Sequence, residues 1–101
     1  MDTVISNAKE ELIAQGLDPV TTVVNIALEP HDVYIGRRSK WGNPFKTGRD
    51  GTKQEVIDRY RQEILPTLAP YLHELVGKRL GCHCKPDACH GDVLAEAVNL
   101  I

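Results

Sequence analysis

Long apolar runs, a full set of paired cysteines and a strong net charge are all absent from this sequence of 101 residues. No uninterrupted apolar stretch approaches the roughly 20 residues needed to cross a bilayer, and no basic segment followed by an apolar one resembles a secretory signal. Three cysteines cannot all pair within one chain, and free thiols favour a reducing compartment. We therefore expect one cytoplasmic domain, residues 1–101, without a membrane partner.

The formal net charge of −2 also argues against a long nucleic acid as partner, because its phosphates require a broad basic surface. The charge is unevenly distributed along the chain. Residues 1–30 carry one cationic and five acidic residues, whereas residues 31–50 carry five cationic and two acidic ones. This basic segment suits a phosphate or a small polyanion, and a solvated loop with scattered charges is the alternative.

Apolar periodicity and turn signals predict an α/β domain with a short sheet and flanking helices, in two or three layers. Helices are expected at residues 3–15, 53–64 and 68–76 and after residue 92, with Thr52 and Glu55 as a capping box. Strands are expected at residues 21–28, 33–36 and 79–84. Because only four residues separate the first two strands, we expect an antiparallel hairpin and hence a mixed sheet.

The second and third strands are joined by a long loop and a helical crossover, so they should run parallel with a right-handed connection. Parallel alignment brings the loops that follow them to one edge of the sheet, where ligands of open α/β sheets bind. We expect the ligand-binding residues at this junction, and they are Gly36, Arg37, Arg38, Trp41, Asn43, Cys84, Lys85, His90, Gly91 and Asp92.

Residues 79–92 contain every cysteine of the chain and two of its four histidines. One interpretation is a zinc site made by Cys82, Cys84, Cys89 and His90, although adjacent ligands and Cys-x-Cys spacing make a poor chelate. The opposite interpretation is that Cys82 and Cys84 are core residues on the same strand face as Leu80, because cysteine is among the most buried residue types.

Two further interpretations concern the start of the last helix. Cys89 at a helix N-terminus beside basic residues could be a nucleophile, with His90 or His83 as the base. Alternatively, the helix start recognises a phosphate or ribose without covalent chemistry. In that case Arg37 and Arg38 would neutralise charge, and Trp41 or Tyr34 would stack on a base. Trp41 as a packed loop anchor is the competing reading.

The runs VYIGRRSKWGNPF and GKRLGCHCKPDACHGDVLAE resemble the phage and bacterial family labelled domain of unknown function 4326. The resemblance covers about residues 23–99. It implies a small α/β domain and a phage or prophage setting, and therefore the cytoplasm of a host. The family usually carries an aromatic residue where this chain has His83, so the ring is expected to matter more there than its basicity.

Together these features predict a protein that binds a nucleotide or nucleotide-derived small molecule at the junction of residues 36–46 and 84–92. A small hydrolase or transferase that uses Cys89 and His90 is one alternative. A phage protein that binds and inhibits a host partner is another. We expect no cofactor, with zinc as the minority alternative, and the sequence leaves formation of a homo-oligomer open.

Overall fold

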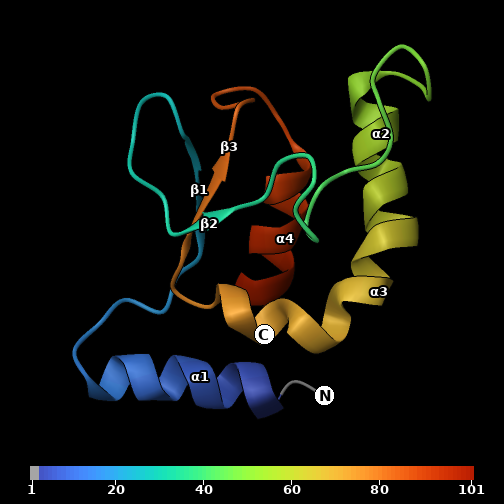
Figure 1. Ribbon diagram of the computed structural model, residues 1–101. Coiled ribbons are helices and arrows are strands. Elements are labelled where there is room, and N and C mark those ends of the chain that lie inside the picture. Colours follow the sequence, from blue (N-terminus) through green and yellow to red (C-terminus); the bar gives the residue numbers. More distant parts are fainter. Residues whose placement is uncertain (1–2) are drawn as a thin grey trace.

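The computed structural model describes residues 3–101, whose helices and strands follow the order expected from the sequence (Figure 1). The elements are α1 (Thr3–Ala14), β1 (Thr22–Asn25), β2 (Val33–Tyr34), α2 (Lys53–Arg59), the π-helix η1 (Tyr60–Ile64), α3 (Leu65–Leu68), the 3-10 helix η2 (Ala69–Leu75), β3 (Arg79–Cys82) and α4 (His90–Asn99). Within this described part, no helix combines the length and the apolar character that membrane crossing requires.

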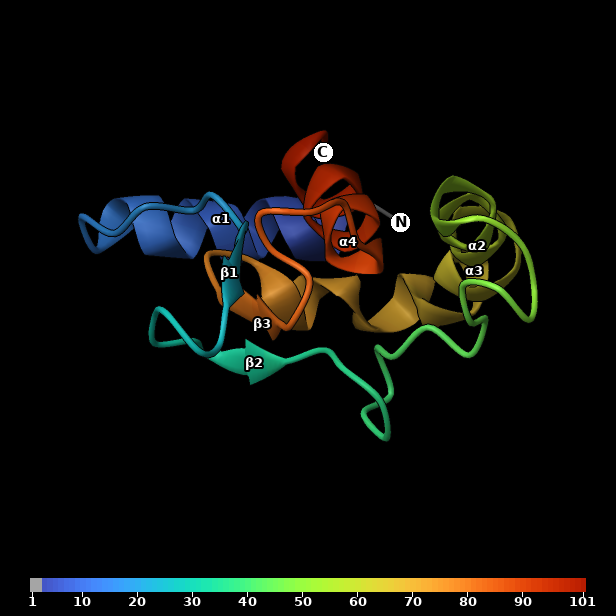
Figure 2. The same ribbon diagram turned by 90° about the horizontal axis from the view of Figure 1, so that it is seen from above.

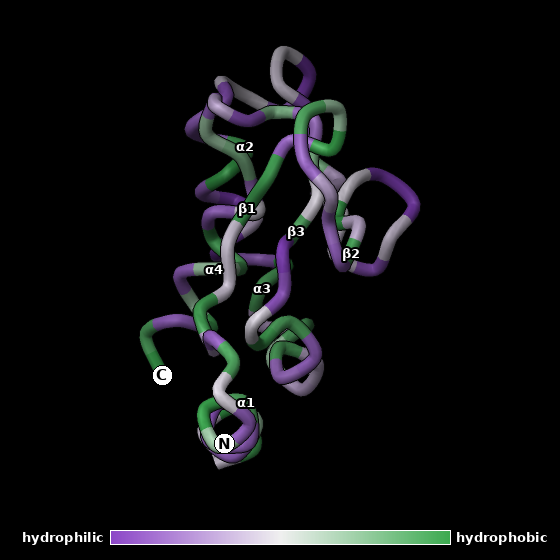
Figure 3. The backbone as a smooth tube through the Cα atoms, turned by 90° about the vertical axis from the view of Figure 1, so that its left-hand side faces the viewer, coloured by the Kyte–Doolittle hydropathy of each residue, from purple (hydrophilic) through white to green (hydrophobic). Residues whose placement is uncertain are grey.

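The three strands form one parallel sheet in the order β1-β3-β2, with β3 in the centre (Figure 3). Thr22–Asn25 pairs with Arg79–Cys82, and Val33–Tyr34 pairs with residues 80–81 of the same central strand. The expected antiparallel hairpin is therefore wrong, and the sheet is parallel rather than mixed. The α/β class itself is confirmed.

The hairpin prediction failed because it took β1 and β2 to be neighbours. Since β3 lies between them, residues 26–32 must lead from the end of β1 back to the start of β2. This return covers about 7 Å along the strands and about 10 Å across the sheet, which is two strand spacings. Seven extended residues reach about 23 Å, so a connection without a helix is long enough. The expected strands were also too long, because the N–H groups of Leu28 and Glu29 turn back to the carbonyl of Asn25 at 3.0 Å each.

A nearly continuous helical path over residues 53–75 connects the loop after β2 to β3. Its start is as predicted, because the Thr52 hydroxyl accepts from the Glu55 N–H at 3.1 Å while the Glu55 carboxylate accepts from the Thr52 N–H at 2.9 Å. The helices expected at residues 53–64 and 68–76 are not separated, and Pro66 between them does not interrupt the path. It lies in the first turn of α3, where a missing N–H is tolerated.

Helix α4 packs against β1 and β3 and covers one face of the sheet (Figure 2). Val93, Leu94 and Val98 of this helix share the buried core with Leu80 of β3. On β3, a Cβ atom at Gly81 would lie 2.6 Å from side-chain carbons of Ile26 and His31. The connection between β1 and β2 therefore packs directly on the backbone of the central strand, which only glycine permits.

Candidate functional site

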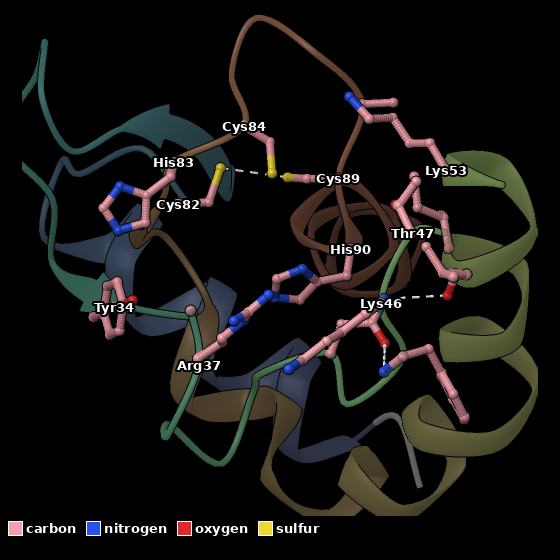
Figure 4. Close-up of a pocket in the computed structure, with 16 residues that line it drawn as sticks. Tyr34, Arg37, Lys46, Thr47, Lys53, Cys82, His83, Cys84, Cys89 and His90 are labelled. Carbon is pink, nitrogen blue, oxygen red and sulfur yellow. Dashed lines mark hydrogen bonds between the residues drawn. The ribbon is translucent and has the colours of Figure 1, made fainter. Parts of the chain in front are cut away.

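A cavity of about 620 Å³ lies where β2 and β3 end, between the loop that follows β2, helix α2 and the start of α4 (Figure 4). Its volume is within the range of about 300–1,000 Å³ typical of small-molecule sites. The lining comes from four chain segments and consists of Tyr34, Gly36, Arg37, Asn43, Phe45, Lys46, Thr47, Lys53, Val56, Ile57, Cys82, His83, Cys84, Ala88, Cys89 and His90.

The parallel pairing of β2 with β3 explains why these segments meet. Both strands point their carboxyl ends at the same edge of the sheet, so the loops after Tyr34 and after Cys82 leave the sheet together. The predicted convergence of the Arg37 loop with Cys84, Cys89 and His90 is thus present in the structure.

Positive charge dominates the lining. Arg37, Lys46 and Lys53 contribute cationic side chains (Figure 4), whereas no aspartate or glutamate occurs among the described residues of the wall. Within residues 3–101, Arg37 and Lys46 take part in no salt bridge, and Lys53 has a single exposed partner, Asp87, at 3.3 Å. Arg37 and Lys46 therefore offer the cavity positive charges that no carboxylate of residues 3–101 neutralises.

His90 is held in one orientation by the backbone of the neighbouring strand end. Its Nε2 lies 2.7 Å from the carbonyl oxygen of Ile35. A carbonyl can only accept, so Nε2 carries the proton, and in the neutral ring Nδ1 is the free acceptor. Burial lowers the pKa of His90 below its usual 6.5, against the smaller opposing effects of the Ile35 carbonyl and Asp92. The imidazole is therefore neutral at physiological pH.

Two of the three cysteines form the buried inner wall of the cavity. Cys82 at the end of β3 and Cys89 at the N-cap of α4 are 2% and 3% exposed, and their sulfur atoms lie 3.4 Å apart. Burial, followed by the hydrogen bond to Cys82, raises the pKa of Cys89 to about 12. Cys89 is therefore a thiol near neutral pH, which weakens the interpretation of this residue as a nucleophile.

Cys84 differs from this pair because it lies beyond the end of β3 and is exposed. The expectation that Cys82 and Cys84 share one strand face is wrong, since the strand ends at Cys82. Desolvation by neighbouring atoms raises the pKa of Cys84 as well. Among residues 3–101, no group of three or more His, Cys, Asp or Glu side chains is arranged to hold a metal ion. The absence of zinc stays a prediction.

The loop after β2 is anchored to the crossover helices by its tryptophan and asparagine. Trp41 is 4% exposed, and its carbonyl accepts the hydroxyl of the buried Tyr60 at 2.6 Å. Asn43 bridges the backbone, because it donates to the Val56 carbonyl at 3.1 Å and accepts from the Phe45 N–H at 3.0 Å. Trp41 is therefore a core anchor. The prediction that its ring stacks on a ligand is wrong, because the ring is buried.

Several expected ligand-binding residues occupy supporting positions around the cavity. Lys85 and Asp92 form a salt bridge with each other, and Asp92 also accepts the N–H of Cys89 at 3.2 Å. Gly91 is buried, and a Cβ atom there would lie 2.6 Å from Ile35. These residues fix the start of α4, so neither the charge of Lys85 nor that of Asp92 is left for a ligand.

Gly36 and Arg38 lie at the loop as expected. A Cβ atom at Gly36 would meet the phenol of Tyr34 within 2.3 Å, so the absence of a side chain lets that ring fold back beside the loop. Arg38 does not line the large cavity. It lines a smaller one of about 250 Å³ beside it, together with Arg37, Asn43 and Lys46.

Several lining residues are not among the ligand-binding residues expected from the sequence. Phe45 and Lys46 belong to the loop after the second strand, and Lys46 is one of the five cationic residues of residues 31–50. Both could therefore have been predicted from the composition of that loop. Lys53, Val56 and Ile57 gave no such signal. They reach the cavity only because α2 lies across from the end of β3 (Figure 1), and an amphipathic pattern does not reveal where a helix is placed.

Comparison with known proteins gives a family and two viral relatives. The domain family DUF4326, described as a domain of unknown function, matches residues 22–100. An uncharacterized 12.4 kDa protein of the nrdA-td intergenic region of Enterobacteria phage T4 is 37% identical over 84 residues, which cover 76% of each chain. An uncharacterized protein of Acanthamoeba polyphaga mimivirus is 34% identical over 89 residues, which cover 69% of this chain and 68% of the relative. No solved structure matches.

Proposed function

The chain belongs to the DUF4326 family, and we propose that it binds a nucleotide or a nucleotide-derived small molecule in the cavity at the end of β2 and β3. The observation that carries this proposal is the charge of the lining. Arg37, Lys46 and Lys53 face a space without carboxylates, in a chain whose acidic residues outnumber its lysines and arginines by 14 to 12.

The unneutralised cations favour an anionic ligand. Arg37 and Lys46 have no carboxylate partner among residues 3–101, and their summed field in one concave surface raises the local concentration of anions. An arginine fork and a lysine ammonium are also the two groups that most often hold phosphate oxygens. A phosphorylated ligand therefore fits this wall better than a neutral or cationic one.

The remaining lining favours a ligand with a planar, largely apolar part. Phe45, Val56, Ile57 and Ala88 present apolar groups to the same cavity. Arg59 stacks on the outside of the Phe45 ring at 3.9 Å, which holds that ring in place. A base and a sugar can use this surface while the phosphate reaches the cations, which is the usual division of polar and apolar contacts in such pockets.

His90 supports recognition better than Cys89 supports nucleophilic attack. The fixed imidazole presents Nδ1 as an acceptor, which suits a ligand hydroxyl or amino group. A thiol with a pKa of about 12 carries very little of the thiolate that attack requires. The alternative of an enzyme that uses Cys89 and His90 is therefore the weaker proposal, and inhibition of a host partner has no specific contact in its favour.

Isothermal titration calorimetry with a panel of adenine and guanine nucleotides, including cyclic and ADP-ribose forms, tests the proposal. We expect at least one to bind with an affinity that falls as salt is raised. Lys46→Gln should weaken binding about tenfold, or ~1.4 kcal/mol. Lys78→Gln is the matched control, because Lys78 is an exposed lysine at the opposite end of β3 and takes part in no salt bridge within residues 3–101. This variant should bind normally.

The same samples distinguish binding from catalysis. After denaturation, the bound nucleotide should be recovered unaltered, and Cys89→Ser should retain most of the binding. A cleaved product that disappears in Cys89→Ser would establish the enzyme instead. Failure of every nucleotide to bind the folded protein would refute the proposal and would leave the cationic wall for a macromolecular partner.

A further inference from the structure

We infer that the smaller cavity beside the main one is a subsite for a phosphoanhydride chain, so that the ligand is a nucleoside di- or triphosphate or a diphosphate-linked nucleotide. This inference rests on the proposed function, because it assigns the second part of the same ligand. The two cavities are adjacent, since Arg37, Asn43 and Lys46 line both of them.

The size of the smaller cavity suits the slimmer part of a ligand better than a base with its sugar. Its volume is about 250 Å³, below the range of about 300–1,000 Å³ in which drug-sized ligands bind. The main cavity, at about 620 Å³, accommodates the larger group. A single ligand that occupies both therefore has a bulky part in the main cavity and a slim extension that passes Arg37 and Lys46.

The chemistry of the smaller cavity suits an anionic extension. Arg37, Arg38 and Lys46 line it, and its other described lining residues carry no acidic group. Within residues 3–101, none of these three cations forms a salt bridge, although seven other lysines and arginines do. Two guanidinium groups and an ammonium supply enough donors for more than one phosphate.

The backbone at Arg38 indicates that this arginine is held there at a cost. Its φ angle is +72°, and it is the one described non-glycine residue with positive φ. The left-handed conformation costs an ordinary residue about 1 kcal/mol, whereas glycine adopts it freely. Hydrogen bonds fix the turn on both sides of Arg38. The Ser39 N–H and hydroxyl both donate to the Gly36 carbonyl, and the Gly42 N–H donates to the Ser39 carbonyl. Retaining arginine where glycine suits the backbone points to a use for its side chain.

Arg38→Gly is the decisive variant, because Arg38 lines the smaller cavity and not the main one. Glycine relieves the left-handed strain, so the variant should fold with unchanged or slightly raised stability. We expect its affinity for ATP and ADP-ribose to fall at least tenfold while its affinity for AMP changes less than twofold. Arg38→Lys keeps the positive charge but loses the guanidinium fork, so its affinity for ATP and ADP-ribose should lie between those of the wild type and Arg38→Gly. A loss with ATP alone would identify a free polyphosphate as the group that Arg38 binds, whereas a loss with both ligands would show that a linked diphosphate binds there as well.

Inorganic triphosphate separates the failure of this inference from the failure of the proposed function. If AMP and ATP bind equally well and Arg38→Gly affects neither, the subsite is refuted while nucleotide binding stands. If no nucleotide binds but triphosphate does, in a manner that Arg38→Gly abolishes, the subsite stands and the nucleotide proposal fails. If wild-type protein binds neither, both are refuted.

Discussion

Tyr60→Phe removes a single oxygen atom from the core and tests how the Trp41 loop is held. The Tyr60 side chain is fully buried, and its hydroxyl donates to the Trp41 carbonyl at 2.6 Å. The variant leaves that carbonyl without its partner in a buried position, which costs about 1–3 kcal/mol. The ring itself stays in place against His90, at 5.0 Å between centroids. We expect a loss of about 2 kcal/mol in the free energy of unfolding.

Urea denaturation followed through the fluorescence of Trp41, the single tryptophan of the chain, measures this loss directly. With a urea dependence of roughly 1 kcal/mol per molar for a small domain, the midpoint should fall by about 2 M. Tyr71→Phe is the matched control, because Tyr71 is 45% exposed and should change stability by less than about 0.5 kcal/mol. A Tyr60→Phe loss no larger than that of the control would refute the buried hydrogen bond as the anchor of the loop.

Three further predictions concern the site and the sheet. The pKa of His90 is lowered in the folded state, so the stability that its neutral ring contributes is full above the unfolded pKa of about 6.5 and is lost as the pH falls below that value. His90→Gln should therefore make the free energy of unfolding less dependent on pH below about 6.5. An unchanged pH dependence would contradict the burial of a neutral His90. In the native protein, an aromatic disulfide reagent should modify Cys84 quickly but reach Cys82 and Cys89 only after unfolding, so rapid reaction of all three thiols would contradict their burial. Gly81→Ala should cost about 1–3 kcal/mol in thermal or urea unfolding, because the new methyl group overlaps Ile26 and His31, and a stable variant would show that the connection does not pack on β3.

Local features of the chain were predicted more accurately than the order of the strands. Thr52 and Glu55 predicted the start of α2 correctly, because a capping box depends on residues only three positions apart. The pairing of β1 with β3 joins Thr22 to Arg79, and nothing near either residue specifies that partner. The hairpin was inferred from chain distance alone, and this rule fails when a distant strand inserts between two short ones.

The residues of the candidate site also differ in how well the sequence predicted their positions. Arg37, Cys84 and His90 were placed correctly because the parallel direction of two strands determines where their loops meet. The sequence left two roles for Trp41, because an aromatic residue in a loop can be a packed anchor or a ligand contact. Only its burial in the structure distinguishes the two. Lys53 was missed because its contribution depends on where α2 crosses the domain.

The central position of β3 also has a consequence for synthesis of the protein. In the described sheet, β1 and β2 each pair with β3 and not with each other. Both strands therefore remain unpaired while the ribosome makes the following 40 or more residues, because their partner begins at Arg79. Contacts of this range form slowly, since a long loop must close before any pairing compensates for it. A nascent chain stalled before residue 79 would expose two short strand edges and no finished cavity, so the cavity and the sheet should be completed in a single step when residues 79–101 emerge.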